Sequence, residues 1–165
     1  MISVKGTLSG LVRLAEPVTR RLLHFYWRFT RSVTLGVRAL VRDREGRIFL
    51  VKHSYVSGWH LPGGGVEPGE MIAAALTREL REEGNIEIAG APRLFAVYFN
   101  AKISRRDHVA LFVVEDFRQP SPPRSNAEII DHGFFPPAAL PDGTTPATRA
   151  RIAEVLEGKG ISELW

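Results

Sequence analysis

The chain has 165 residues, enough for one domain with a full hydrophobic core and too few for two domains of ordinary size. It contains no cysteine, which excludes disulfides, a thiol nucleophile and a cysteine-ligated zinc site. Its formal net charge of +4 suits a polyanionic ligand, but a surplus of this size is also common on solvated surfaces, so nucleic-acid binding is not expected as the main role.

No stretch of the sequence has the pattern of a membrane span or a secretion signal. Charged residues interrupt the apolar runs well before the roughly 18 residues that a span needs. The first residues lack the unbroken apolar core and the small-residue cleavage site of a signal peptide. We therefore expect a cytoplasmic protein without an integral membrane span.

An amphipathic helix is predicted near the N-terminus. It follows Pro17, a residue that suits a first helical turn. Its apolar positions recur with helical spacing and its other face is basic: Val18, Leu22, Phe25 and Phe29 against Arg20, Arg21 and Arg28. We expect this helix, within an extension of residues 1–30, to pack across a main domain of residues 31–160 or to form a homodimer interface. The alternative is a helix that lies on a membrane surface.

The main domain is expected to open with two strands. Residues 33–41 are rich in β-branched side chains, and residues 47–52 have a similar pattern. Between them, Asp43 to Gly46 supplies turn residues that end in a glycine. The pattern predicts an antiparallel hairpin, followed by a loop that ends in Trp59.

The rest of the chain alternates predicted helices and strands. A helix is expected from Glu70 to about Gly84, and strands at 93–99, 108–116 and 128–135. A last helix runs from Pro146 to Gly158, with Thr145 as its N-terminal cap. Antiparallel strands with helices between them predict an α/β fold, a sheet flanked by helices.

The first of these helices carries the chemically informative residues. At about 100° per residue, with Glu79 at zero, Glu83 falls near +40° and Glu82 near −60°. Ala75 lies between these carboxylates and is small enough to leave room for a ligand. The adjacent apolar stripe, expected to face the core, is formed by Leu76, Leu80 and Ala73.

Three like charges on one helix face destabilise the helix unless they have a partner. A hard divalent cation would supply one, because carboxylate oxygens are the ligands that Mg²⁺ and Mn²⁺ prefer. A merely solvated, charged helix face is the other interpretation of these residues.

A glycine loop before the helix favours the metal interpretation. Gly63, Gly64 and Gly65 allow the backbone to approach a ligand closely. Pro68 and Gly69 then turn the chain into the helix. The unit is not a P-loop, because no Gly-Lys-Ser/Thr follows the glycines.

The segment from Gly64 to Ile86 resembles the Nudix box, G-x5-E-x7-R-E-U-x-E-E-x-G-U, where U is aliphatic. The positions in register are Gly64, Glu70, Arg78, Glu79, Leu80, Glu82, Glu83 and Ile86. One position departs, because Asn85 stands where the family has its second glycine. Asparagine tolerates the left-handed conformation better than other non-glycine residues, so we expect the helix end to survive.

The resemblance implies a Nudix-like α/β/α sandwich with a mixed, largely antiparallel sheet, and a pyrophosphohydrolase activity that depends on Mg²⁺, with Mn²⁺ as a substitute. Its implied substrate is a nucleotide-like small molecule, a nucleoside diphosphate linked to another moiety. Glu79 would orient or deprotonate the attacking water, and Arg78 would pair with Glu70. The implied metal ligands are Glu79, Glu82, Glu83, the carbonyl of Gly64 and a downstream carboxylate, for which we favour Glu128 over Glu115, Asp116 and Asp131.

The substrate pocket is less well defined by the sequence. Lys52, His53 and Tyr55 end the second strand near the glycine loop and are expected to reach phosphates, together with Gly63 and Gly65. A base could stack on Trp59, Tyr98 or Phe134, although each of these side chains also suits core packing. The alternative function is a non-catalytic Nudix-fold module that senses a nucleotide. Such a module is expected to lose box carboxylates, whereas this chain keeps them.

Overall fold

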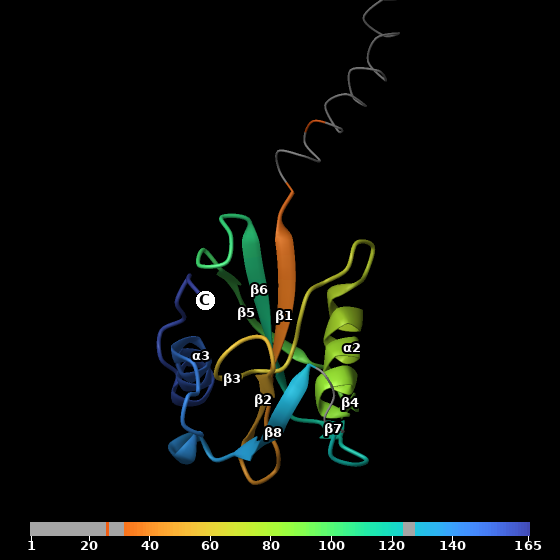
Figure 1. Cartoon of the computed structure of the whole chain (residues 1–165), viewed down its shortest axis with the longest axis vertical. Helices are drawn as coiled ribbons and strands as arrows, with labels where there is room; N and C mark the ends of the chain where they lie inside the picture. Colours follow the sequence, from red (N-terminus) through yellow and green to blue (C-terminus); the bar gives the residue numbers. More distant parts are fainter. Residues whose placement is uncertain (1–25, 27–31, 124–127) are drawn as a thin grey trace, which may run out of the picture. The chain divides into compact units, whose positions relative to one another are not determined.

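The computed structural model of the protein describes Tyr26, residues 32–123 and residues 128–165. The chain divides into two units, Met1–Val33 and Thr34–Trp165, and the second unit carries the elements described below (Figure 1). The helix predicted from Pro17 lies outside the described residues, apart from Tyr26, which is helical and exposed.

The second unit follows the predicted order of elements closely. Its helices are α2 (Ile72–Gly84), the short 3-10 helix η1 (Pro137–Ala139) and α3 (Pro146–Glu157). Its strands are β1 (Thr34–Val41), β2 (Ile48–His53), β3 (Trp59–His60), β4 (Glu87–Ile88), β5 (Arg93–Phe99), β6 (Asp107–Val114), β7 (Phe117–Arg118) and β8 (Ile129–Phe135).

The strands form two three-stranded sheets and one short pair. In the first sheet β6 lies between β1, to which it is parallel, and β5, to which it is antiparallel. In the second sheet β2 lies between β3 and β8, and both pairings are antiparallel. The pair β4–β7 is also antiparallel. The prediction of a mixed, largely antiparallel sheet is therefore confirmed.

The predicted hairpin of the first two strands is wrong beyond its turn. The turn forms, with Gly46 at φ 79° and its N–H donating to the carbonyl of Asp43 over 3.0 Å. After one bridge between Arg42 and Ile48, however, β1 pairs with β6 and β2 pairs with β3 and β8. Strand β2 is buried on both faces, and so is the second half of β1, which is typical of strands that pack between two layers.

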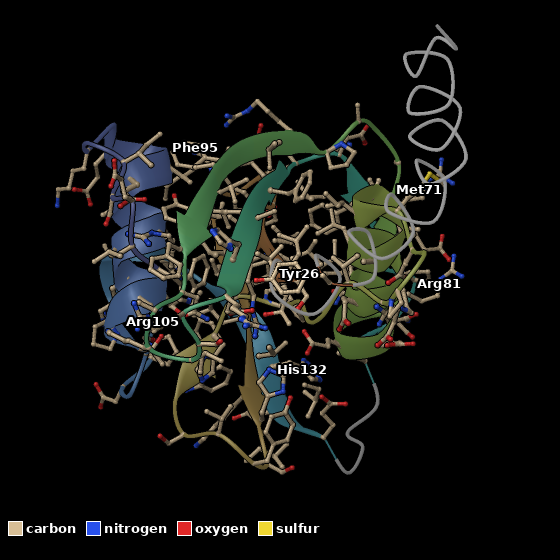
Figure 2. The ribbon with its side chains drawn as sticks, turned by 90° about the horizontal axis from the view of Figure 1, so that it is seen from above. Tyr26, Met71, Arg81, Phe95, Arg105 and His132 are labelled. Atoms are coloured by element: carbon tan, nitrogen blue, oxygen red, sulfur yellow. The ribbon has the colours of Figure 1, made fainter. Side chains whose placement is uncertain are left out.

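The sheets lie between two helices, as Figures 1 and 2 show from two directions. Alternate residues of β2 explain these layers, because successive side chains point to opposite faces of a strand. Phe49 and Val51 join a core cluster with Leu76 and Leu80 of α2. Residues of the other face, such as Leu50, join a second cluster that includes Ile152 of α3. This α/β/α arrangement is the predicted one.

The ends of the helices show which local signals decided them. Helix α2 starts at Ile72, two residues later than predicted, after an N-cap at Met71 that makes no side-chain capping bond. It ends at Asn85, which adopts the left-handed conformation at φ 48° as expected. The side-chain amide of Asn85 also donates to the carbonyl and hydroxyl oxygens of Ser121. Helix α3 is capped as predicted, since Thr145 Oγ1 accepts from the N–H of Thr148.

Candidate active site

The glycine loop lies along β1. The N–H of Val37 donates to the carbonyl of Gly64 over 2.8 Å, and the N–H of Val66 donates to the carbonyl of Leu35 over 2.9 Å. Gly63 adopts φ 137°, and a Cβ there would collide with the carbonyl of Val37. The loop therefore needs glycine at 63 both for its backbone conformation and for its close approach to β1.

This packing aims the loop at two glutamates of α2. The N–H of Gly63 donates to Oε2 of Glu83 over 2.7 Å in a buried hydrogen bond. The Cα of Gly64 lies so close to the Glu79 carboxylate that a Cβ would overlap it. Only a residue without a side chain leaves space for Glu79 at this point, so the two box positions depend on each other.

Arg78 ties the loop to the helix. Its Nε and Nη2 donate to the two carboxylate oxygens of Glu70 over 3.1 and 3.0 Å, which is the predicted pair. Nη2 also donates to the carbonyl of Gly65, and Nη1 lies 2.6 Å from Oε1 of Glu79. The hydrogen bond from Arg78 lowers the pKa of the Glu70 carboxyl, and the carboxylates raise the pKa of Arg78. Five donors in a fixed fork make arginine suited to such a network.

The carboxylates of α2 are not equivalent. Glu83 is 4% exposed, and burial raises its pKa to about 8, although Arg38 and the N–H of Gly63 oppose this. Burial also raises the pKa of Glu79, against the effect of Arg78. The side chain of Glu82 is 61% exposed and lies 3.5 Å from Arg78. Arg78 Nη1 thus contacts both Glu79 and Glu82, so Glu82 lies at the exposed rim of the cluster and Glu83 at its buried end.

Two predicted neighbours of these carboxylates are placed differently. Ala75 is fully buried in the core cluster between α2 and the sheets, so it leaves no room for a ligand. Ala73, predicted to face the core, is exposed. Leu76 and Leu80 are buried as predicted, so the buried side of the helix extends to Ala75 and Glu83 and does not include Ala73.

His53 and Glu128 complete the cluster from β2 and the start of β8. His53 Nε2 lies 3.5 Å from Oε1 of Glu83, and its Nδ1 lies 4.0 Å from Oε1 of Glu128. Tyr55 donates its hydroxyl to Oε1 of Glu128 over 2.8 Å, and the N–H of Ser54 donates to the Glu128 carbonyl. Burial lowers the pKa of His53 to about 4, helped by Arg38, and the same effect raises the pKa of Tyr55 to about 12.

A pocket of about 450 Å³ adjoins this cluster. The three predicted substrate-binding side chains, Lys52, His53 and Tyr55, all line it. The other lining residues are Ser54, Val56, Ser57, Gly58, Trp59, Ile130, Asp142 and Gly143. The loop glycines are divided: Gly63 faces β1, whereas the Cα of Gly65 adjoins open space.

Two of the aromatic residues considered for base stacking belong to the core. Tyr98 is fully buried and donates its hydroxyl to Glu154 over 2.7 Å. Phe134 packs on Phe49 and Phe117. Trp59 lines the pocket but is 7% exposed and packs edge-on against Phe135. The sequence does not distinguish these roles, because a core aromatic and a stacking aromatic look alike in it.

Arg38 is a site residue that the sequence analysis missed. It lies in β1, donates from Nη1 to the carbonyl of Leu61 over 2.9 Å, and lowers the pKa of both Glu79 and Glu83. A signal was present, because Arg38 is the one charged residue in the apolar run 33–41. Its positive charge is shared between buried carboxylates, so it neutralises the cluster only in part.

The donors present fit a divalent cation. Burial makes it costly in free energy to ionise Glu83 and, to a lesser degree, Glu79. A bound cation would offset this cost by stabilising both carboxylates. His53, Glu83 and Glu128 each offer a ligand atom, and these atoms lie within 4.8 Å of one another. The fold and site thus define an α/β protein whose buried carboxylates face a glycine loop, a class of site suited to a metal and an anionic ligand. Among the helices that the structure describes, none is long and apolar enough to cross a membrane.

Comparisons with known proteins agree with this assignment. The family model described as NUDIX domain matches residues 33–156, so the chain belongs to the Nudix family. It is 39% identical over 69 residues to an RNA pyrophosphohydrolase of Legionella pneumophila (strain Corby), covering 39% of each chain. It is 33% identical over 75 residues to diphosphoinositol polyphosphate phosphohydrolase 2 of Rattus norvegicus, covering 45% of this chain and 41% of the relative. The chain thus spans well under two thirds of the length of these relatives.

The fold also matches solved structures. A MutT NUDIX hydrolase from Burkholderia pseudomallei is 27% identical, with a TM-score of 0.64, and the match covers 75% of this chain and 98% of that one. The Nudix membership and the α/β/α sandwich inferred from the box are therefore both confirmed.

Proposed function

We propose that the chain is a metal-dependent pyrophosphohydrolase. It uses water to cleave a phosphoanhydride bond in a nucleoside diphosphate linked to another moiety. The observation that carries this proposal is the pair of buried Glu83 and partly buried Glu79, held against the glycine loop with raised pKa values. The relatives named as a pyrophosphohydrolase and a phosphohydrolase support it.

The residues that would hold Mg²⁺, or Mn²⁺ in its place, are Glu79, Glu82, Glu83, the carbonyl of Gly64 and Glu128. The Gly64 carbonyl already accepts one hydrogen bond, from Val37, which leaves a second lone pair for a cation. Bound there, the cation neutralises the charge that builds on the phosphate oxygens.

The protein's own groups position and deprotonate the water. Glu79 is the proposed general base, because it lies beside the glycine loop and burial raises its pKa, which makes the carboxylate a better proton acceptor. The water oxygen bonds to phosphorus, its proton passes to Glu79, and the bridging P–O bond breaks with its electrons on the departing phosphate. Arg78 holds Glu79 in place through the 2.6 Å ion pair, and it is itself anchored by Glu70.

The substrate is proposed to lie in the pocket beside the cluster. Lys52 lines this pocket and offers a cation for a phosphate, and Tyr55 offers an exposed ring. The open side of Gly65 leaves the backbone of the loop accessible, whereas Gly63 is committed to Glu83. The pocket walls are mixed in character, so the geometry supports a nucleotide-like substrate without selecting a base.

The location and the N-terminal extension belong to the same proposal. A cytoplasmic enzyme is expected, with residues 1–30 packing on the domain, joining two copies, or recruiting it to a membrane. Deleting residues 1–30 and comparing both the oligomeric state and the localisation with the full chain separates these roles. A change in neither would leave packing on the domain as the role.

The activity is tested with a panel of nucleotide sugars, dinucleoside polyphosphates, nucleoside triphosphates and 5′-capped RNA. Purified protein with Mg²⁺ or Mn²⁺ should release phosphate-containing products from at least one member, and chelation should stop this. Glu79→Gln should lower kcat at least about 100-fold, the size typical of a general base. Glu87→Gln, on an exposed residue just after α2, is the matched control and should keep full activity.

Full activity of Glu79→Gln would contradict the assigned base. A panel that stays intact with both metals, although one member binds, would support the nucleotide-sensing module instead.

A further inference from the structure

The feature that the proposed function does not use is the imidazole of His53. It lies at the end of β2, on the same face as Phe49 and Val51, and therefore points toward α2. The register of β2 against β8 shifts between Lys52 and His53, an irregularity of the kind that re-aims side chains near active sites. The strand thus places a polar ring where the pattern of the preceding residues would place an apolar one.

This ring is buried and lacks hydrogen bonds. His53 is 4% exposed, and among the described residues neither Nδ1 nor Nε2 has a hydrogen-bond partner. A buried polar atom without a partner costs free energy, so buried groups of this kind in folded proteins are usually satisfied by protein, water or an ion. Its nearest charged neighbours are carboxylate oxygens of Glu83, at 3.5 Å, and Glu128, at 4.0 Å.

The two carboxylates are held in position by other groups. Gly63 donates its N–H to Oε2 of Glu83 and leaves Oε1 facing the imidazole. Tyr55 and the N–H of Ser54 fix Glu128 through its carboxylate and its carbonyl. One atom from each of His53, Glu83 and Glu128 can therefore meet within 4.8 Å, with the histidine supplying nitrogen and the others oxygen.

We propose that His53, Glu83 and Glu128 form a mixed nitrogen–oxygen site for a first-row transition-metal ion, with Mn²⁺ or Co²⁺ bound in preference to Mg²⁺. Oxygen-only sites suit Mg²⁺, whereas an imidazole ligand favours the transition metals. The inference rests on the proposed function in one respect, since Glu83 and Glu128 also belong to the proposed catalytic metal site and only His53 is new. The sequence had suggested that His53 binds phosphate, whereas this proposal makes it a metal ligand.

The test records pulsed electron paramagnetic resonance of Mn²⁺ bound to the full chain, without substrate. A histidine ligand gives ¹⁴N modulation of the spin echo, and growth with ¹⁵N-histidine should replace it with ¹⁵N modulation. His60→Gln, which removes an imidazole whose ring centroid lies 5.8 Å from that of His53, should keep the signal. His132→Gln on β8, labelled in Figure 2, is a second control that should also keep it.

His53→Gln should abolish the modulation and weaken Mn²⁺ or Co²⁺ binding at least about tenfold in calorimetry, with a smaller effect on Mg²⁺. Wild-type protein without histidine modulation at saturating Mn²⁺ would overturn the proposal, and so would a folded His53→Gln that keeps the signal. If His53→Gln does not fold, loss of the signal in His60→Gln or His132→Gln overturns it equally. The ¹⁴N modulation is recorded without turnover, so the two proposals are tested separately. Absence of the modulation would not contradict the hydrolase proposal, and absence of hydrolysis would not contradict the metal site at His53.

Discussion

The buried carboxyl of Glu83 is placed for function at a cost in folding stability. Replacing Glu83 with glutamine should remove that cost. In metal-free protein burial raises its pKa from the ordinary 4.5 to about 8. Below pH 4.5 the carboxyl is protonated whether the chain is folded or unfolded, so it does not affect the balance. As the pH rises from 4.5 to 8 the unfolded chain loses the proton first, and the folded state is progressively destabilised.

The size of the effect follows from that interval. At about 1.4 kcal/mol per pH unit, the cost is on the order of 3 kcal/mol at pH 7 and 5 kcal/mol above pH 8. Glu83→Gln removes this titration but keeps an oxygen to accept the N–H of Gly63. Its amide can also donate to Nε2 of His53, which has no hydrogen-bond partner among the residues that the structure describes. We therefore expect the variant to be more stable than the wild type by an amount that grows with pH.

The assay is urea unfolding in a chelator at pH 5, 7 and 9. The difference in free energy of unfolding between variant and wild type should be small at pH 5 and largest at pH 9. Glu87→Gln, on an exposed glutamate, is the control and should show no such trend. A Glu83→Gln variant that is less stable than the wild type at pH 7, or a difference that is equal at pH 5 and pH 9, would refute this account of the buried carboxyl.

Three further predictions follow from single contacts. Gly64→Ala should lower kcat about 100-fold, because the added Cβ displaces the Glu79 carboxylate. Tyr55→Phe should weaken Mn²⁺ binding about tenfold in calorimetry, because Glu128 loses the hydroxyl that orients it. Thr145→Ala should lower the free energy of unfolding by about 1 kcal/mol through loss of the α3 cap, with kcat unchanged.

Each has a control or an opposing outcome. Gly160→Ala, where the Cβ meets no neighbour, should not change kcat, and an equal loss in both glycine variants would point to a general effect. Wild-type Mn²⁺ affinity in Tyr55→Phe would show that the Tyr55 hydroxyl does not orient Glu128 for the metal. A fall in kcat for Thr145→Ala would place α3 nearer to the reaction than the structure does.

The box helix was predictable because its chemistry is local. The pairing of Arg78 with Glu70 was implied by the resemblance to the Nudix box, and it forms although Glu70 lies just before α2. The left-handed end at Asn85 was predictable from the sequence, since a single residue decides it.

Contacts between strands were not predictable in this way. The turn at Gly46 is encoded locally, but the partners of β1 and β2 depend on how the whole set of buried strands is best paired, and the hairpin was therefore wrong. His53 meets Glu128 only because β8 pairs with β2, and Arg38 reaches the carboxylates only because the glycine loop packs on β1. The orientation of α2 was likewise set by packing, which placed Ala75 in the core.

The central claim is that water attacks phosphorus at a metal-dependent site. Turnover of a cleaved substrate in H₂¹⁸O, with products analysed by mass spectrometry, tests it most directly. The account predicts one ¹⁸O atom in a phosphate group of one product, with no cleavage in chelator. Label on carbon, unlabelled phosphate products, or the same rate with the metal removed would contradict it.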